Sequence, residues 1–289
     1  MKKRYFKIGT ILNYFFLLLL AVLMFYPFYY VVIYSISTYN DIVGKGAILR
    51  PYGVTLEAIR AVLTNKNIYT AYANTIFIVV VGTGLSVLTE MLMAYPLARK
   101  VKGHRVISFL VYFTMLFNGG LIPTYYIVRS TGLLNSIWSV IIPVLVNPFY
   151  IFLIRAYYQG LPDSLIESAA IDGASEARTF VSIILPMCSP IIATITLMTA
   201  VAHWNSWFTA SLYIRDAGTK PLQLIIRELL IQTSDEMSSG ISSQFDVTKL
   251  TPSTLRMAMV TVSTLPIVCL YPFLQKYFVK GVTLGAVKG

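Results

Sequence analysis

The sequence predicts an all-α protein that crosses a membrane several times. Its mean hydropathy is +0.70, and only 12% of its 289 residues are charged, which is about half of the charged fraction of a typical soluble domain. Several apolar runs approach or exceed the roughly 20 residues that a helix needs to cross a bilayer. We therefore expect a polytopic membrane protein with six transmembrane helices.

The amino-terminal part should form the first of these helices. A basic start, which includes Lys2, Lys3 and Arg4, precedes an apolar run at residues 11–35. This run is too long for a signal peptide and has no small-residue cleavage site, so we expect it to be retained as a span. The polar stretch that follows predicts an external loop with a short helix near residues 56–63. Residues 1–69 thus comprise a cytoplasmic tail, one span and an external loop.

Residues 70–278 are expected to form one transmembrane domain, followed by a tail at residues 279–289. Pro143 and Pro148 should kink the fourth span, because proline interrupts helical hydrogen bonding. Gly119, Gly120 and Pro123 should loosen the far end of the third. The spans predicted after the first cover residues 70–95, 106–128, 137–158, 186–212 and 255–278.

Glu90 is the only acidic residue inside a predicted span. A carboxylate within a membrane is expensive and is by default a functional candidate. Glu90 lies close to the basic end of its span at Arg99 and Lys100, however. This position favours a role at the interface or against a neighbouring helix.

The distribution of basic residues predicts the orientation of the chain. Six spans place both termini on the same side of the membrane. Lys and Arg gather in short segments beside the spans, at the amino terminus and at residues 99–105, and such segments face the cytoplasm. Both termini and the loop at residues 161–186 should therefore be cytoplasmic. The net charge of +11 then reflects topology and contact with lipid headgroups, and we expect no nucleic-acid partner.

No set of residues for catalysis or metal binding is visible. Cys188 and Cys269 lie in apolar runs without CxxC spacing, and His104 and His203 are far apart. No phosphate-binding GxxxxGK[ST] motif occurs. We expect a non-catalytic chain without a metal or cofactor of its own, so that any nucleotide is bound by another subunit.

The loop at residues 161–186 predicts two short helices joined by a tight turn. Ser164 and Glu167 have the spacing of a capping box at the start of the first helix. Gly173 supplies the positive φ that a helix carboxyl terminus often needs. Ser175 can cap the second helix, and Pro186 suits the first turn of the fifth span.

This loop also carries a family resemblance. The run at residues 167–174 (ESAAIDGA), followed by Ile184, Leu185 and Pro186, resembles the EAA loop of importer permeases of the ATP-binding-cassette class, with Ser168 in place of the first alanine. Its small side chains leave a surface that another protein can approach closely. The resemblance implies that an ATPase subunit contacts Glu167, Ala169, Ala170, Asp172, Gly173, Ala174, Leu185 and Pro186.

A second resemblance covers most of the chain. The segments at residues 203–208 (HWNSWF), 212–214 and 275–281 resemble the smaller permease of maltose-type carbohydrate importers. Residues 117–125 (FNGGLIPTY) are similar to a subgroup that carries complex oligosaccharides. The resemblance implies a type I importer fold in a bacterial cell membrane. It also implies a second permease subunit, two ATP-binding-cassette subunits that bind ATP and magnesium, and an external solute-binding protein.

Sugar binding requires aromatic rings for stacking and amides that both donate and accept hydrogen bonds. Trp204, Asn205 and Trp207 provide these groups, and on a continuous helix the two tryptophans would share a face. Asn118 and Tyr125 join this substrate path through the oligosaccharide-type segment. An aromatic belt at the membrane interface would give the same pattern. The polar segment at residues 213–254 could contact the binding protein or be a solvated loop.

Two other classes of membrane protein stay as alternatives. An integral membrane glycosyl or acyl transferase would need clustered acids or a His–Asp set at one membrane face, and none is visible. An ion-coupled secondary transporter normally has inverted repeats and broken helices with intramembrane charges, whereas only Glu90 is available here. The leading prediction is the permease subunit of an ATP-driven carbohydrate importer.

Overall fold

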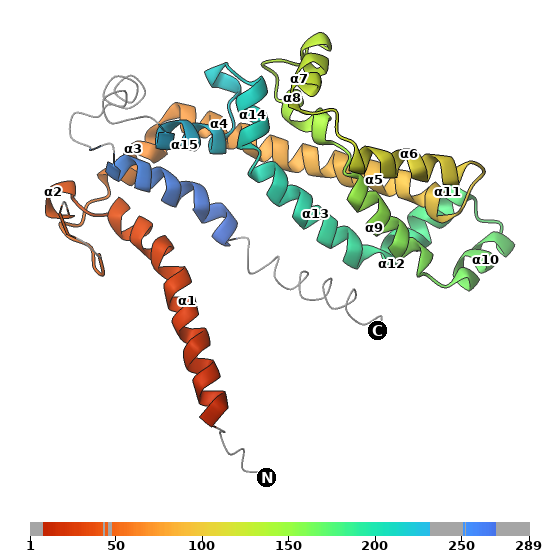
Figure 1. The fold of residues 1–289 in the computed structure, drawn as a ribbon, viewed down its shortest axis with the longest axis horizontal. Helices are drawn as coiled ribbons and strands as arrows, with labels where there is room; N and C mark the ends of the chain where they lie inside the picture. Colours follow the sequence, from red (N-terminus) through yellow and green to blue (C-terminus); the bar gives the residue numbers. More distant parts are fainter. Residues whose placement is uncertain (1–7, 43, 46–47, 232–250, 252, 270–289) are drawn as a thin grey trace. The chain divides into compact units, whose positions relative to one another are not determined.

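The computed structural model describes residues 8–42, 44–45, 48–231, 251 and 253–269 (Figure 1). Within these ranges the chain is almost entirely helical, and its β-structure is limited to an isolated bridge between Ser37 and Val54. The chain divides near Ile68 and Ile225 into two compact units. Several predicted segments lie outside the described residues. These are the basic start at residues 1–7, residues 232–250 of the polar 213–254 segment, the 275–281 segment and the carboxyl-terminal tail at residues 279–289.

The first unit contains α1 (Ile8–Ser35), a helix long and apolar enough to cross a membrane, where the sequence predicts the first span. The chain after α1 folds back through α2 (Tyr39–Ile42) and α3 (Glu57–Thr64). Ile33, Ile42 and Ile48 form its small buried core, and α3 matches the helix predicted near residues 56–63. A helix at residues 253–269 begins where the sixth span was predicted.

The second unit is built on one continuous helix of 33 residues, Lys66–Ala98, which is longer than the predicted span. It comprises α4 (Lys66–Phe77), a π-helical turn η1 (Ile78–Gly82) and α5 (Thr83–Ala98). A Cβ atom on Gly82 would lie 2.9 Å from the Nε2 atom of His203. Glycine at this position therefore permits a close helix contact.

The third predicted span is not one helix. It consists of α6 (His104–Leu116) and α7 (Leu121–Ser130), which are bent by 113°. Gly120 adopts a φ of +90°, and the Asn118 Oδ1 atom accepts a hydrogen bond from the Gly120 N–H at 2.8 Å. The glycine pair thus reverses the chain rather than merely loosening a helix end.

The fourth span is interrupted at its prolines, as the sequence predicts. The helix α8 (Trp138–Ile141) continues into the 3₁₀ turn η2 (Ile142–Val144), and α9 (Pro148–Gln159) follows at an angle of 53°. The Asn147 side chain caps α9 by accepting from the Phe149 N–H.

The predicted start of the fifth span at Pro186 is wrong. Pro186 lies near the end of a helical stretch, Glu176–Met187, and a 78° bend at Cys188 separates this stretch from α13 (Ser189–Trp204). Pro190 occupies the first turn of α13, where its missing N–H costs nothing. The elements of the stretch are α11 (Glu176–Thr179), η3 (Phe180–Ile184) and α12 (Leu185–Met187).

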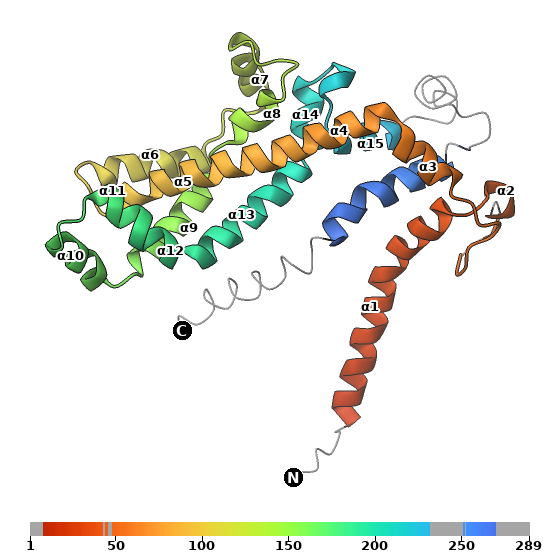
Figure 2. The ribbon, with the colours of Figure 1, turned by 180° about the vertical axis from the view of Figure 1, so that it is seen from behind.

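The fifth span also ends earlier than predicted. The helix breaks after Trp204, and α14 (Trp207–Tyr213), η4 (Ala217–Thr219) and α15 (Leu222–Ile231) follow. In the second unit, α5, α9, η3 and α13 share a buried apolar core that includes Met91, Ile151, Ile184 and Ile195. Figures 1 and 2 show α10 (Asp163–Ile171) and α11 at one end of this unit and α14 toward the other.

Candidate functional site

The 161–186 loop contains the two helices that the sequence predicts. The first is α10 (Asp163–Ile171), and Gly173 follows it with a φ of +77°. The Ser175 hydroxyl caps α11 by accepting a hydrogen bond from the Arg178 N–H at 3.3 Å. The capping box at Ser164 is absent, because Pro162 occupies the N-cap position and Ser164 already lies inside the helix.

Most of the residues predicted to contact an ATPase lie on the outer surface of this loop. Glu167, Ala170, Asp172, Gly173 and Pro186 are exposed, Ala174 and Leu185 are half-buried, and Ala169 is buried beneath α10. The loop therefore presents small and acidic side chains outward and uses Ala169 for its own packing.

Ile171 is the residue at this surface that sequence reasoning missed. Its side chain is 85% exposed and lies at the end of α10, directly before the turn at Asp172 and Gly173. An apolar side chain at the tip of a polar loop could have been noticed in the sequence. Together with the small neighbouring residues, Ile171 makes this tip suited to burial against a partner.

A polar contact fixes the loop to the end of α5. The carboxylate of Glu176 pairs with the Arg99 guanidinium at 3.6 Å and accepts a hydrogen bond from the Tyr95 hydroxyl. A cavity of about 190 Å³ lies beside this contact, and Arg99, Glu167 and Glu176 are among its lining residues. Sequence reasoning did not single out Glu176, because its partners come from a distant helix.

An aromatic cluster anchors the loop more deeply. The Tyr95 ring of α5 packs on the Phe180 ring with centroids 4.8 Å apart. Tyr158 of α9 contacts both rings edge-on, at 6.2 Å from Tyr95 and 6.4 Å from Phe180. Phe180 and Tyr158 are buried, so these contacts join α5, α9 and the second helix of the loop around one core.

The residues predicted to contact a sugar lie toward the opposite end of the second unit, and they do not form one surface. Trp204 ends α13 and is only 8% exposed. Asn205 is exposed, and its side-chain amide donates to the Val201 carbonyl at 2.9 Å. Trp207 begins a new helix, α14. Because the helix breaks between them, the two tryptophans do not share a helical face as the sequence predicts.

Asn118 and Tyr125 are also separated from each other. Asn118 stabilises the reversal between α6 and α7, whereas the ring of Tyr125 stacks on Tyr213 of α14 with centroids 6.1 Å apart. Asn135 holds the same region together: its N–H donates to the Tyr213 carbonyl at 2.9 Å, and its Oδ1 accepts from the Arg215 N–H at 2.7 Å. Tyr213 is thus an aromatic residue near the predicted path that sequence reasoning did not select.

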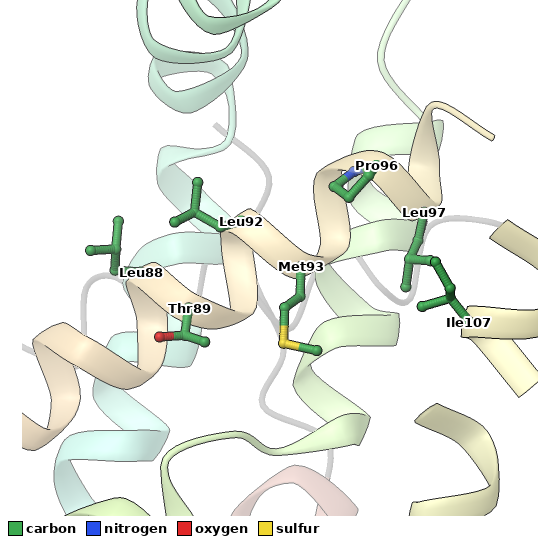
Figure 3. A pocket seen from close by; sticks show the side chains of 7 residues that line it. All are labelled: Leu88, Thr89, Leu92, Met93, Pro96, Leu97 and Ile107. Carbon is green, nitrogen blue, oxygen red and sulfur yellow. The ribbon is translucent and has the colours of Figure 1, made fainter. Parts of the chain in front are cut away.

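A further cavity, of about 380 Å³, runs along the outer face of α5 (Figure 3). The Thr89 hydroxyl is the polar side-chain group in its lining, and it already donates to the Leu85 carbonyl at 2.7 Å. The cavity therefore has no free group with which to orient a sugar and suits an apolar chain. Its lining residues are Leu88, Thr89, Leu92, Met93, Pro96, Leu97 and Ile107.

In the part of the chain that the structure describes, no three His, Cys, Asp or Glu side chains come together as a metal site would require. The two exposed helices of the 161–186 loop, α10 and α11, are fixed on a helical core. This arrangement suits a membrane subunit that is moved by a partner protein. A family model described as "Binding-protein-dependent transport system inner membrane component" matches residues 5–284. The chain belongs to this family. The permease is therefore a non-catalytic component of an ATP-binding-cassette transporter, whose ATPase is a separate subunit.

Curated relatives and a solved structure agree with this assignment. The permease is 40% identical to the "Polygalacturonan/rhamnogalacturonan transport system permease protein YtcP" of Bacillus subtilis (strain 168), over 100% of both chains. It is also 40% identical to "Protein LplC" of the same organism, over 91% of the permease and 89% of LplC.

The solved structure is that of a bacterial ABC transporter involved in the import of the acidic polysaccharide alginate. One of its chains matches the permease with a TM-score of 0.86 and 31% identity, covering 96% of the permease and 99% of that chain. The permease thus has the type I importer permease fold, and it is a permease subunit of a carbohydrate importer. Neither a membrane transferase nor an ion-coupled transporter is favoured.

Proposed function

We propose that the permease forms one half of a translocation path for acidic oligosaccharides and that its 161–186 loop docks on an ATPase subunit. The substrate class is supported by YtcP, which is named for polygalacturonan, and by the alginate importer. Both polymers carry uronate carboxylates.

The observation that carries the docking role is the way the 161–186 loop is mounted. Its tip exposes Ile171, while its second helix is fixed to α5 and α9 through Glu176 and Phe180. A force applied to the tip would therefore reach the core of the second unit as a rigid-body displacement. We assign the contact with the ATPase to the exposed residues of the loop.

The proposed partners follow the organisation of such importers: a second permease, two ATP-binding-cassette subunits that hold ATP and magnesium, and an external solute-binding protein. The helix Lys66–Ala98 runs along the second unit, and its residues 78–98 span about 30 Å at about 1.5 Å per residue, the thickness of a bilayer core. This length suits one crossing of a membrane. The basic segments beside the predicted spans support a cytoplasmic 161–186 loop with both termini on the same side, in a bacterial cell membrane. The exposed aromatic face of α6, including Phe109 and Phe113, would meet lipid or the second permease.

We place the sugar path at the opposite end of the unit. Asn205, Trp207 and Tyr125 are accessible there to different degrees and provide an amide and aromatic rings for sugar contact. Trp204 is buried, so we assign it to the support of this region. Asn118 would shape the turn between α6 and α7.

The proposal is tested with the purified importer in liposomes, supplied with its loaded solute-binding protein. Uptake of a uronate oligosaccharide is compared with uptake of the same oligosaccharide after its carboxyl groups have been reduced to alcohols. We expect ATP-dependent uptake that strongly prefers the uronate form. Equal uptake of the two forms would contradict the acidic substrate class. Uptake without ATP would contradict the transport mechanism.

A further inference from the structure

A buried carboxylate in the second unit has no part in the proposed path or in the docking surface. Glu90 lies on α5, and its side chain is only 1% exposed. Burial of an acid in a membrane span is costly unless the group is paired or functional. A leucine at this position would fill the space without the free-energy cost of burying a carboxylate. We therefore expect the Glu90 carboxylate to have a structural role.

The role of Glu90 is indicated by its partner. The Glu90 Oε1 atom accepts a hydrogen bond from the backbone N–H of Asn147 at 2.9 Å. Asn147 is the N-cap residue of α9 and lies at the break of the fourth span. Glu90 thereby satisfies a backbone N–H that the break in the fourth span would otherwise leave unpaired in the core. The carboxylate thus fastens the beginning of α9 to α5.

The second carboxylate oxygen of Glu90, Oε2, lies among other buried polar groups. Glu90 Oε2 is buried and has no hydrogen-bond partner among the residues that the structure describes, and the same holds for the hydroxyls of Thr83, Ser86 and Thr199. Thr83, Ser86 and Glu90 recur on one face of α5 at helical spacing. Thr199 comes from α13, which packs against α5. The buried face of this part of α5 thus carries polar groups whose hydrogen-bonding capacity the described residues leave unmet.

Glu90 also marks a change in the packing of α5. From Met91 to Leu97, toward the 161–186 loop, the buried face of α5 is apolar. From Thr83 to Glu90 it is largely polar. The apolar half holds α5, α9 and α13 together through dense packing. In the polar half, the hydrogen bond of Glu90 is a polar contact that fastens α5 to the beginning of α9.

The position of α9 links this contact to the loop. The helix α9 runs from the break at Asn147 to Gln159, and the 161–186 loop follows directly. At its loop end, Tyr158 belongs to the aromatic cluster with Tyr95 and Phe180. The two ends of α9, about 16 Å apart at the helical rise, are therefore each fixed to α5.

We propose that Glu90 is a positioning residue for energy coupling: its carboxylate fixes the amino end of α9 to α5, so that the two helices and the 161–186 loop move as one body. This inference rests on the proposed docking role of the loop. Glu90 touches neither the ATPase nor the sugar, and it acts through α9.

The test uses the purified importer complex in liposomes and measures oligosaccharide transported per ATP hydrolysed. Glu90→Gln keeps an oxygen that can accept from the Asn147 N–H, so we expect coupling within about twofold of the wild type. Glu90→Leu removes the acceptor, and Glu90→Asp withdraws it by one methylene while retaining a carboxyl group. Both should lower transport per ATP by about tenfold, the factor expected when a buried N–H loses its acceptor. Met91→Leu, a volume-conserving change at the next residue, is the matched control.

A second measurement does not depend on transport. Hydrogen exchange of the peptide that contains Asn147 should be slow in the wild type and in Glu90→Gln, and about tenfold faster in Glu90→Asp. If Glu90→Leu fails to assemble, the Asp and Gln variants decide the question. Normal coupling in the Asp variant would overturn the proposal, and so would a Gln variant as defective as the Asp variant.

The Gly173→Leu variant, measured alongside, separates this inference from the proposed function. Normal coupling in Gly173→Leu would refute the docking role of the loop. Slow exchange at Asn147 in Glu90→Asp would refute the fastening role of Glu90 even if the loop docks as proposed.

Discussion

Substitution of Gly173 gives a sharp test of the docking surface, because the structure separates its two possible effects. Gly173 has a φ of +77°, and a Cβ atom added there would meet no atom within 4 Å. An alanine at this position therefore causes backbone strain without a clash inside the permease. The cost of a left-handed conformation for a residue with a Cβ atom is about 1–2 kcal/mol. This energy corresponds to a change of about 5–30-fold in the ratio of the native turn to other conformations.

We predict that Gly173→Ala lowers the apparent affinity of the permease for its ATPase by up to about 5–30-fold, since only the native turn presents Ile171 and Asp172 correctly. Gly173→Leu should lower it further, because its side chain projects from an exposed turn toward the partner. The assay is titration of detergent-solubilised permease pairs with purified ATPase, together with ATP hydrolysis stimulated by the loaded solute-binding protein.

The chain contains a matched control at Gly132. Its φ is +72°, it is exposed, and a Cβ atom there would also meet nothing within 4 Å. Gly132→Ala therefore carries the same strain in the turn after α7, away from the 161–186 loop. We expect it to leave ATPase affinity unchanged. If both alanine variants weakened ATPase binding equally, or neither did, the reasoning from the turn to the docking surface would be wrong.

Other predictions concern the tip, the anchor and the core. Ile171→Ser should weaken ATPase binding by on the order of 1 kcal/mol, because an 85% exposed apolar side chain would lose its burial in the complex; unchanged affinity in the same titration would place the contact elsewhere. Glu176→Gln should weaken the contacts with Arg99 and Tyr95 but cost under about 1 kcal/mol, since the ion pair is largely exposed; thermal unfolding of the complex measures this, and a large loss would contradict it. Gly82→Ala should lower the melting temperature markedly, because its Cβ would lie 2.9 Å from His203; wild-type melting behaviour would show that the helices can separate freely.

Local sequence rules predicted the 161–186 loop well. The positive φ of Gly173 and the cap at Ser175 depend on neighbouring residues alone, so the sequence contains all the information needed. The capping box at Ser164 was wrong for an equally local reason. Pro162 took the N-cap position, and the helix began one residue before the predicted cap.

The bends within the spans were harder to predict. Hydropathy stays high up to Cys188, and the short polar run at Asn205 and Ser206 is too brief to mark a helix end, so hydropathy alone does not distinguish one helix from two at an angle. The same limit affected Trp204 and Trp207, whose predicted shared face required an unbroken helix. Only backbone geometry, such as the 78° bend before α13, resolves these cases.

The role of Glu90 lay beyond sequence reasoning for a different reason. Its partner Asn147 is 57 residues away, and the bond uses a backbone group that no residue type reveals. The sequence marked Glu90 as an unusual acid inside a span and favoured a role at the interface or against a neighbouring helix, and the hydrogen bond to the amino end of α9 fits the second of these.

Site-directed cross-linking tests the central claim most directly, namely that the 161–186 loop contacts the ATPase. Cys188 and Cys269 are free cysteines and would first be replaced by alanine. A single cysteine is then introduced as Asp172→Cys, or as Gly132→Cys for comparison, and the assembled importer is treated with a short bifunctional reagent in membranes. We predict a cross-link to the ATPase subunit from Asp172→Cys and none from Gly132→Cys. A cross-link from Gly132→Cys alone, or none from Asp172→Cys in an importer that still transports, would contradict the account.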